Sequence, residues 1–384
     1  MTEEVESVDV AIVGAGPVGM ALALALIDSP YRILLIDSRR RGSWAGDPRA
    51  LALSHGTRQL LAGVGAWNAG DATPIDTIHV SQKGGFGRTL IDAADYDIPS
   101  LGYVLRYRDL AGSLDARCET VQRLDQCTIG GIAIGRDTAE ISLRSGDTTR
   151  RVAARLVVHA EGTPGDDADV RVHDYRQHAV VAEVRPLPAH GRRAWERFTP
   201  DGPVALLPLG QDYAVVFTVP SAQAGGLLCL DDDAFLAALR AQFAGRLDFI
   251  ASGPRSSFPL ALRCRRELVA ARQVWIGNAA QSLHPVSGQG FNLGLRDAWE
   301  LAEALRTATG RDPGEASLLS SYARGRQLDR QGSMVFTDGI VRIFSNDLAP
   351  LRVARGLSLL ALDLLPPLRH FVAKRMIWGA RAWP

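Results

Sequence analysis

Residues 277–294 read GNAAQSLHPVSGQGFNLG, and this segment carries more information than any other part of the chain. It follows an apolar run at residues 274–276, which predicts a strand, and it leads into residues 295–302, which predict a helix. Three glycines surround Gln289 just before that helix. Such a loop lets backbone N–H groups approach an anionic or electron-rich ligand at the positive end of the helix. The segment therefore predicts a ligand-binding loop.

A second glycine-rich turn lies near the N-terminus, where an apolar run leads into GAGPVG at residues 14–19. The spacing is G-x-G-x-x-G, placed between a predicted strand and a predicted helix at residues 20–27, and a second strand ends at an acid. The first glycine permits the tight turn, the second lets the backbone approach a pyrophosphate, and the third allows close helix–strand packing. The acid can accept hydrogen bonds from the adenosine ribose. The predicted dinucleotide-binding residues are Gly14, Gly16, Pro17, Gly19 and Asp37.

The two glycine-rich segments together favour FAD over a nicotinamide cofactor. An acid rather than an arginine at position 37 argues against a ribose 2′-phosphate, which excludes NADP from this site but not NAD. An NAD dehydrogenase would normally follow its nucleotide-binding domain with a separate catalytic domain. Here the chain returns in its C-terminal third with a second cofactor-contacting segment. That return suits FAD, with the adenine half on the N-terminal unit and the flavin half under the distant loop.

Size and composition exclude several other classes. A chain of 384 residues predicts two intertwined domains, and a net charge of +1 gives no general field for nucleic acid. The four cysteines are widely spaced, so we expect neither a disulfide scaffold nor a metal site. The N-terminus carries no signal peptide, and no apolar run reaches ~18 residues. We therefore expect a cytoplasmic protein.

The middle of the chain predicts a separate β-sheet. Apolar runs at residues 179–184, 204–209 and 214–219 indicate strands, and residues 78–81 and 89–91 indicate a strand pair in the same layer. We expect this sheet to form the roof of a substrate cavity. The predicted division is a discontinuous FAD-binding domain at 1–73, 101–171 and 260–345, a substrate-binding domain at 74–100 and 172–259, and a helical tail at 346–384.

Three segments carry a resemblance to a known family: DPRALALS at residues 47–54, AWERFTPDGPVALLPL at 194–209, and residues 277–297. With these, the chain resembles the aromatic-ring flavoprotein monooxygenases, the group that includes para-hydroxybenzoate hydroxylase. Within the group it looks most like the ubiquinone-biosynthesis hydroxylases, and among those like the 2-polyprenyl-6-methoxyphenol hydroxylases. The implied fold is α/β, with a Rossmann-like FAD-binding domain of the para-hydroxybenzoate hydroxylase type, an inserted β-sheet substrate domain and a helical C-terminal tail.

The resemblance implies roles for the matching residues. Gly277 and Asn278 would hold the ribityl chain and pyrophosphate of FAD, and Arg49 would lie near the flavin. Residues 285–292 would line the flavin ring, and the implied residues there are Pro285, Gly288, Gln289, Gly290, Phe291 and Asn292. The catalytic candidates are Pro285, Gln289 and His284. For His284, contact with flavin or substrate and simple anchoring of the turn before Pro285 are both open.

The chain departs from the family pattern at several positions. Asn278 and Glu161 each replace an aspartate, and residues 163–166 lack the expected Ser-x-x-Arg. The Arg-x-x-Leu expected on the preceding helix is also missing, because Tyr107 stands three positions before Leu110. Asn278 can still hydrogen-bond a ribityl hydroxyl. The other departures concern how a reducing nicotinamide docks.

The implied chemistry is hydroxylation of an aromatic ring. FAD reduced by NAD(P)H would react with O2 to form a C4a-hydroperoxide, which would hydroxylate a polyprenyl-methoxyphenol intermediate of ubiquinone biosynthesis. Three alternatives stay open: hydroxylation at another ring position in the same pathway, a flavin-bearing structural subunit of the biosynthetic complex, and a flavin dehydrogenase or reductase. Other proteins of that complex are candidate partners, and nucleic acid is not.

The tail after residue 346 alternates apolar runs with arginines and lysine, and Asp363 is the only acid in residues 351–384. A basic amphipathic helix fits a membrane surface or a partner protein. Packing back over the FAD-binding domain is the other interpretation, and the two are compatible. We therefore expect a cytoplasmic protein that contacts the inner face of the membrane peripherally through this tail, or whose tail packs on its own fold.

Overall fold

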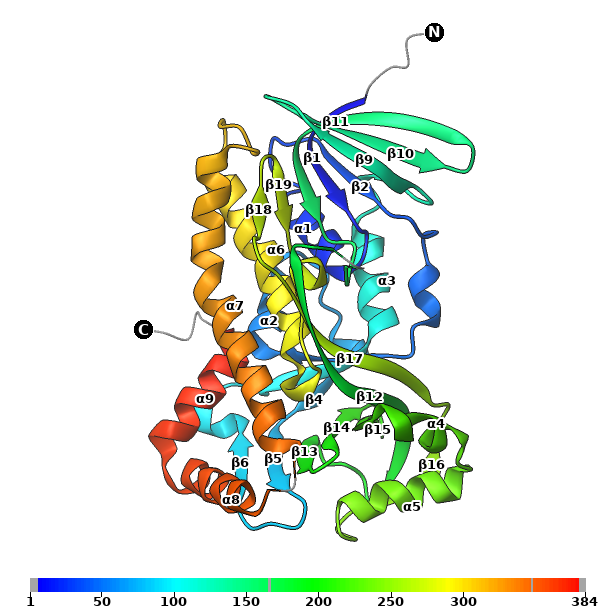
Figure 1. The fold of residues 1–384 in the computed structure, drawn as a ribbon, viewed down its shortest axis with the longest axis vertical. Helices are drawn as coiled ribbons and strands as arrows, with labels where there is room; N and C mark the ends of the chain where they lie inside the picture. The colour runs from blue at the N-terminus through cyan, green and yellow to red at the C-terminus, as the bar shows by residue number, and fades with distance from the viewer. Residues whose placement is uncertain (1–5, 165–166, 347, 380–384) are drawn as a thin grey trace.

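The computed structural model describes residues 6–164, 167–346 and 348–379. Two large sheets are stacked along the long axis of the molecule, and the long strands β12 and β17 run from one toward the other (Figure 1). The residues 165–166, within the segment where Ser-x-x-Arg was expected, lie outside the described part, as do residues 380–384 of the tail.

The first sheet has a parallel centre built on the N-terminal strand. Its path is β18-β19-β11-β1-β2-β8, in which β1 pairs in parallel with both β2 and β11. β1 is almost wholly buried, as a strand covered on both faces must be. The strands are β1 (Glu6–Val13), β2 (Ile33–Ile36), β8 (Gln122–Leu124), β9 (Thr128–Ile134), β10 (Ala139–Ser145), β11 (Thr148–His159), β18 (Val269–Ala270) and β19 (Gln273–Trp275).

Helices from distant parts of the chain cover one face of this sheet. α1 (Pro17–Ala25), α3 (Tyr107–Arg117) and α6 (Gln289–Thr307) share one hydrophobic core with the inner side chains of β1 and β11. The antiparallel β9 and β10 lie against the other face, around Val8, Ile141 and Val157. Both predicted helices begin earlier than expected, at Pro17 and Gln289. Residues 290–292 therefore belong to the first turn of α6.

The second sheet contains the predicted central strands, and all five are confirmed. Its path is β20-β17-β12-β15-β14-β13-β5-β6, with β16 beside β12. The strands are β5 (Thr77–Gln82), β6 (Arg88–Asp92), β12 (Val170–Leu187), β13 (Arg193–Thr199), β14 (Gly202–Leu209), β15 (Asp212–Pro220), β16 (Asp248–Ser252), β17 (Ser256–Arg265) and β20 (Gln281–Ser282). One face packs on α4 (Ser221–Cys229) and α5 (Asp232–Gln242). The domain limits themselves stay a prediction.

A small third sheet joins the two layers. It has the order β3-β7-β4, with β3 (Ala50–Ser54), β4 (Thr73–Ile75) and β7 (Gly102–Arg106). Short helices accompany these connections: α2 (His55–Gly63), η1 (Ser43–Gly46), η2 (Ala69–Asp71), η3 (Ala93–Tyr96), η4 (Gly277–Ala279) and η5 (Val286–Gly288). β3 begins directly after Arg49 and packs against α6.

Three C-terminal helices close one side of the molecule (Figure 1). α7 (Ala316–Phe344) runs along both layers, and then α8 (Ala349–Leu364) and α9 (Pro366–Trp378) meet at a bend of 95°. α8 packs on β5 and β6, whereas α9 packs on α2 and β3. Within the described residues, no single helix is long and apolar enough to cross a membrane. The bent α8–α9 pair meets that criterion only when both are taken together, by length and composition.

Candidate functional site

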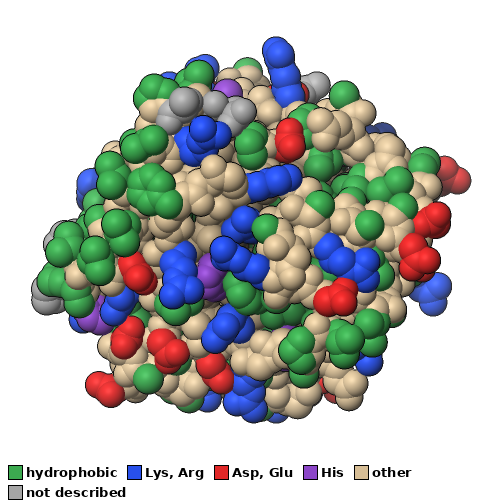
Figure 2. All heavy atoms as spheres, turned by 90° about the horizontal axis from the view of Figure 1, so that it is seen from below, with side chains coloured by type: hydrophobic (Ala, Val, Ile, Leu, Met, Phe, Trp, Pro, Cys, Tyr) green, Lys and Arg blue, Asp and Glu red, His purple; other side chains and the backbone are tan. Residues whose placement is uncertain are grey.

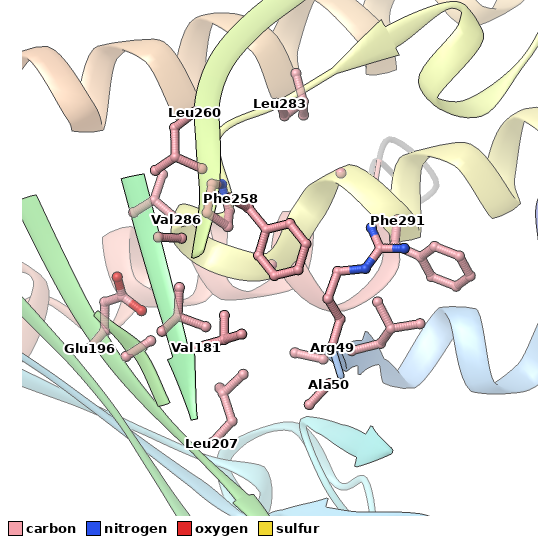
Figure 3. Close-up of a pocket in the computed structure, with 18 of the residues that line it drawn as sticks. Arg49, Ala50, Val181, Glu196, Leu207, Phe258, Leu260, Leu283, Val286 and Phe291 are labelled. Atoms are coloured by element: carbon pink, nitrogen blue, oxygen red, sulfur yellow. The ribbon is translucent and has the colours of Figure 1, made fainter. Parts of the chain in front are cut away.

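One cavity of about 1150 Å³ is bordered by the second sheet, by loops that follow strands of the first sheet, and by the two glycine-rich segments. Figure 3 shows its interior, with Arg49 and Phe291 toward one end and Glu196 toward the other. Pro285 lies in the loop at residues 277–288, which we call the cofactor loop, and lines the cavity. The predicted residues that line this cavity are Gly16, Pro17, Arg49, Asn278, Pro285, Gly288, Gly290 and Phe291.

Two helix N-termini open onto this cavity. α1 begins after Gly16 and α6 begins after Gly288, and in the described structure no side chain caps either end. The first backbone N–H groups of both helices are therefore available to a ligand, and the helix dipoles favour negative charge there. Two such ends on one cavity suit a ligand with a pyrophosphate and an electron-rich ring edge.

The three N-terminal glycines have different constraints. Gly14 has φ +104°, and a Cβ there would lie 2.4 Å from the carbonyl oxygen of Ala160. A Cβ on Gly19 would lie 2.0 Å from the carbonyl oxygen of Gly14. At Gly16 the nearest heavy atom to such a Cβ is Tyr107 Oη at 3.8 Å. Gly14 and Gly19 are thus required by the protein's own packing, whereas Gly16 leaves room that a pyrophosphate can use.

Asp37 is buried behind the first turn and is already hydrogen-bonded. Its Oδ2 accepts from the N–H of Ala15 at 2.8 Å, and its Oδ1 accepts from the N–H of Arg39 at 2.7 Å. Burial alone would raise the pKa of Asp37, but hydrogen bonds from the side chain and backbone of Arg39 and from Ala15 hold it below its usual value. Asp37 therefore stays ionised, and the unpredicted Arg39 lines the cavity beside it.

The Gly277 turn is held from behind by a buried ionic network. The N–H of Gly277 donates to Asp297 Oδ2 at 3.1 Å, and Asp297 Oδ1 pairs with Arg326 on α7 at 2.8 Å. Arg326 and Arg296 both pair with Asp329. With its N–H tied back, the Gly277 turn presents Asn278 to the cavity. This network is the part of the site that the sequence interpretation missed.

Close approach of two helices also depends on glycine at this turn. A Cβ on Gly294 of α6 would lie 3.0 Å from Gly277 Cα and 3.2 Å from the side chain of Val18 on α1. Gly277 itself has φ +60°. The last glycine of the 277–294 segment thus brings the α6 and α1 helices together, so that their N-termini share one cavity.

Asn292 acts through its side chain as well as its backbone position. Its Oδ1 accepts from the N–H of Ser54 at 2.9 Å, and its Nδ2 donates to the carbonyl oxygens of Ala52 and Gly288 at 3.0 and 2.8 Å. These bonds fasten β3 to the first turn of α6. The turn that presents Gly290 and Phe291 to the cavity is therefore rigidly placed.

Arg49 lines the cavity with its charge balanced. It makes a two-point ion pair with Asp47, with Nη2–Oδ2 at 2.6 Å and Nε–Oδ1 at 2.9 Å, and its guanidinium lies 4.7 Å from the Tyr107 ring centroid. The hydrogen bonds that the Arg49 side chain donates to Asp47 raise the pKa of Arg49 above its usual value. Its position fits a neighbour of the flavin, and the Asp47 pair fixes its orientation.

Of the catalytic candidates, Pro285 lines the cavity, whereas Gln289 and His284 are not among its lining residues. Gln289 is buried, and its Nε2 donates to the carbonyl oxygen of Met376 on α9 at 3.3 Å. His284 is 1% exposed, and its Nδ1 accepts from the N–H of Val286 at 3.1 Å. Burial lowers the pKa of His284 to about 4, so its ring is neutral near pH 7. This geometry supports the anchoring interpretation of His284.

The cavity fits the cofactor that the sequence predicts, and the comparisons with known proteins agree. Residues 7–336 match the family model described as FAD binding domain. The chain therefore belongs to this FAD-binding family, and it is an FAD-dependent monooxygenase of the aromatic-ring hydroxylase class. Its α/β fold is similar to p-nitrophenol 4-monooxygenase PnpA from Pseudomonas putida, with a TM-score of 0.78, 17% identity, and coverage of 98% of this chain and 100% of that one.

Three relatives indicate which group of aromatic-ring hydroxylases the chain is similar to. The ubiquinone hydroxylase UbiL of Rhodospirillum rubrum is 35% identical over 98% of this chain and 91% of its own length. The 3-demethoxyubiquinol 3-hydroxylase of Escherichia coli is 31% identical over 92% of this chain and 94% of its own. The human ubiquinone biosynthesis monooxygenase COQ6 is 28% identical over 94% and 91%. The predicted resemblance to the ubiquinone-biosynthesis hydroxylases is thus confirmed.

Proposed function

We propose that this protein hydroxylates the aromatic ring of a polyprenyl-methoxyphenol intermediate of ubiquinone biosynthesis. The observation that carries the proposal is the continuation of the cofactor cavity into an apolar volume under the second sheet. Val181, Leu207, Phe258 and Leu260 border that part. Ligand pockets commonly have volumes of ~300–1000 Å³, so about 1150 Å³ can accommodate a flavin and an aromatic ring.

The chain's residues would orient the reactants and exclude water. Bound FAD, reduced by NAD(P)H, would supply the oxygen chemistry with O2, for which the family resemblance implies a C4a-hydroperoxide. Uncapped N–H groups at the start of α6 would stabilise negative charge on the reduced flavin. The apolar wall around Phe258 and Leu260 would keep water from the reacting ring.

The C-terminal helices would accommodate the polyprenyl chain. Their inward side chains line the same cavity as the cofactor loop, and they include Phe336, Ile340, Phe344, Leu359, Leu362, Val372 and Met376. An isoprenoid chain is purely apolar, so burial along this wall would be favourable by ~25 cal/mol per Å² of buried apolar area. The cavity would therefore take the ring toward the cofactor and the chain toward α8 and α9.

The outer face of the same two helices supports contact with a membrane surface. Large apolar side chains there are exposed, and Leu364 is 66% exposed and Leu365 53%. Figure 2 shows hydrophobic side chains gathered on the side of the molecule where α8 and α9 lie. Arg352 and Lys374 are exposed and add positive charge, which would attract anionic lipids. We infer a cytoplasmic protein that is peripheral to the inner face of the membrane and draws its substrate from the bilayer.

The test is single-turnover oxidation with a short-chain methoxyphenol. Purified holoprotein would be reduced anaerobically by NADH or NADPH and mixed with ¹⁸O2, and the product would be analysed by mass spectrometry. We expect one ¹⁸O atom in a ring hydroxyl, and its position would identify the hydroxylated carbon. Flavin reoxidation without labelled product, even with proteins of the ubiquinone-biosynthesis complex added, would contradict the proposal.

A further inference from the structure

One carboxylic acid lies in an apolar row across the cavity face of the second sheet. Strand pairing places Glu196 on β13 beside Val80 on β5 and Ala205 on β14, and the row continues to Val216 on β15 and Val181 on β12. All five residues line the cavity. Because side chains alternate along a strand, neighbouring Trp195 and Arg197 are directed to the opposite face.

Glu196 has no partner of its own in the described structure. Its Oε1 is buried and makes no hydrogen bond. Arg197, the adjacent cation, donates instead to Ser81 Oγ at 3.1 Å and to the carbonyl oxygen of Gln242. Leaving a carboxyl group buried and unpaired costs free energy of folding. A buried carboxyl group without a partner inside a substrate cavity therefore indicates a ligand that hydrogen-bonds to it.

The described neighbours of Glu196 on the cavity face of the sheet are uncharged. From β5 and β14 it meets Val80 and Ala205, and Val286 of η5 and Ile340 of α7 pack into the adjoining apolar cluster. Burial among these groups raises the pKa of Glu196 to about 8. Near pH 7 the side chain is therefore mainly a neutral carboxylic acid, with one O–H donor and one carbonyl acceptor.

We propose that the Glu196 carboxyl group binds the hydroxyl group of a neutral phenol ring and so positions that ring in the cavity. This proposal rests on the proposed function, and it assigns the polar contact that the apolar wall lacks. The phenol O–H would donate to the carbonyl oxygen of Glu196, and the carboxyl O–H would donate to the phenol or to an ortho alkoxy oxygen. Glu196 would thus act as a positioning and specificity residue.

The same wall disfavours aromatic carboxylates. Each described arginine that lines the cavity already has an acceptor, because Arg39 pairs with Asp37, Arg49 pairs with Asp47, and Arg263 donates to the carbonyl oxygen of Pro164. A ring bearing a carboxylate would have to place its charge beside an acid in an apolar environment. The geometry points to a neutral phenol with an ortho oxygen substituent as the ligand.

The test uses the oxidised, FAD-loaded protein with no reductant, so that binding is separated from turnover. The probes are a short-chain 2-methoxyphenol and its O-methyl ether, and the dissociation constant is followed by the change in flavin absorbance. Glu196→Leu should weaken phenol binding by about tenfold, as loss of a buried hydrogen bond implies, and should weaken binding of the ether less, because the ether accepts from the carboxyl O–H but has no O–H to donate. Glu196→Gln, which keeps one donor and one acceptor, should bind the phenol nearly as well as the wild type.

Two further readouts separate a ligand contact from a structural role. Glu196→Leu should raise the unfolding temperature, because it removes a buried unpaired acid. Wild-type affinity for the phenol should fall as pH rises through about 8, whereas the affinity of Glu196→Gln should not change. Glu183→Gln is the control, since Glu183 also lines the cavity but pairs with Arg106. It should retain the wild-type pH dependence.

Equal loss of phenol and ether affinity in Glu196→Leu would overturn the proposal, because the effect would then be one of shape. A lower unfolding temperature in that variant would also overturn it. Failure of the proposed function would give a different experimental result. Wild-type protein that binds the phenol through Glu196 but incorporates no ¹⁸O would refute hydroxylation and leave the binding site standing.

Discussion

Gly277 and Asp297 are joined by a hydrogen bond from the backbone N–H of Gly277 to Asp297 Oδ2 at 3.1 Å. The same oxygen accepts from Gln281 Nε2 at 2.7 Å, so one carboxylate holds both sides of the turn that carries Asn278. Its other oxygen pairs with Arg326. The position of the Gly277 turn is thus set by Asp297 of α6 and Arg326 of α7, neither of which lines the cavity.

Asp297→Ala should therefore damage both the fold and the cofactor site. The change leaves Arg326 short of a buried partner and frees the Gly277 N–H, and breaking a buried ion pair costs about 3 kcal/mol or more of unfolding free energy. Denaturant unfolding and FAD content per chain would measure the two effects. Glu303→Ala, on the exposed side of the same helix, is the matched control and should change neither. Full FAD occupancy in Asp297→Ala would contradict this account.

Substitutions at Gly14 and Gly16 should have separable effects. Gly14→Ala forces a Cβ to within 2.4 Å of a backbone oxygen at positive φ, so the apoprotein should be destabilised. Gly16→Ala meets no protein atom closer than 3.8 Å, so the apoprotein should keep its stability while FAD binds more weakly. Thermal unfolding without FAD and titration with FAD distinguish the two. If Gly16→Ala binds FAD normally, the pyrophosphate does not lie against this turn.

His284 should make the protein sensitive to acid. Its pKa is about 4 in the folded state, below the ordinary value of 6.5, so the unfolded chain binds the proton more readily. The stabilisation is complete above pH 6.5 and is lost as pH falls toward 4, by roughly 3 kcal/mol for a shift of this size. Unfolding free energy measured across that range should fall less steeply in His284→Asn, whose Oδ1 can still accept from Val286.

The same variant tests the anchoring interpretation of His284. His284→Asn should retain the wild-type pH profile of flavin reoxidation and product formation near neutrality, because a neutral ring buried behind the loop does not titrate there. An acid limb of turnover that disappears in His284→Asn would instead assign the histidine to the chemistry.

The exposed face of α8 and α9 should bind anionic vesicles. We expect the wild type to cosediment with vesicles of phosphatidylethanolamine and phosphatidylglycerol, and added salt should weaken binding. The double variant Leu364→Glu/Leu368→Glu should lose it, because two charges would have to enter the interface. Ile250→Glu is the control, since Ile250 is 59% exposed but lies on β16, away from the tail. Equal binding by the double variant would exclude this face.

Much of the fold can be predicted from the sequence, because the patterns that indicate its strands and helices are local. Strand alternation, the G-x-G-x-x-G spacing and the apolar run before Gly277 each depend on a few consecutive residues, and the corresponding strands and helices are present. Both α1 and α6 begin earlier than the sequence pattern predicts, because that pattern places Pro17 and Gln289 in loops. Both belong to first turns of helices whose ends no side chain caps in the described part of the chain, which composition does not reveal.

The residues that support the site cannot be predicted from the sequence, because their roles depend on strand register and on contacts with distant segments of the chain. Asp297 looks like an ordinary helix acid until α6 and α7 are packed, because its partners lie on the Gly277 turn and on α7. Glu196 stands in a segment that carries the family resemblance, but its isolation depends on which residues of β5 and β14 pair with β13. α8 and α9 pack inward on the fold, as one interpretation of the tail predicts, and they also expose leucines outward, for which contact with a membrane surface stays a proposal.

The link from the Gly277 turn through Asp297 to Arg326 has a consequence for biosynthesis. During translation the pyrophosphate turn at Gly14 leaves the ribosome early, but the residue that locks the flavin loop emerges only with α7. A nascent chain that ends before Arg326 therefore lacks the clamp that closes the site. We therefore expect stable retention of FAD only in chains that include α7.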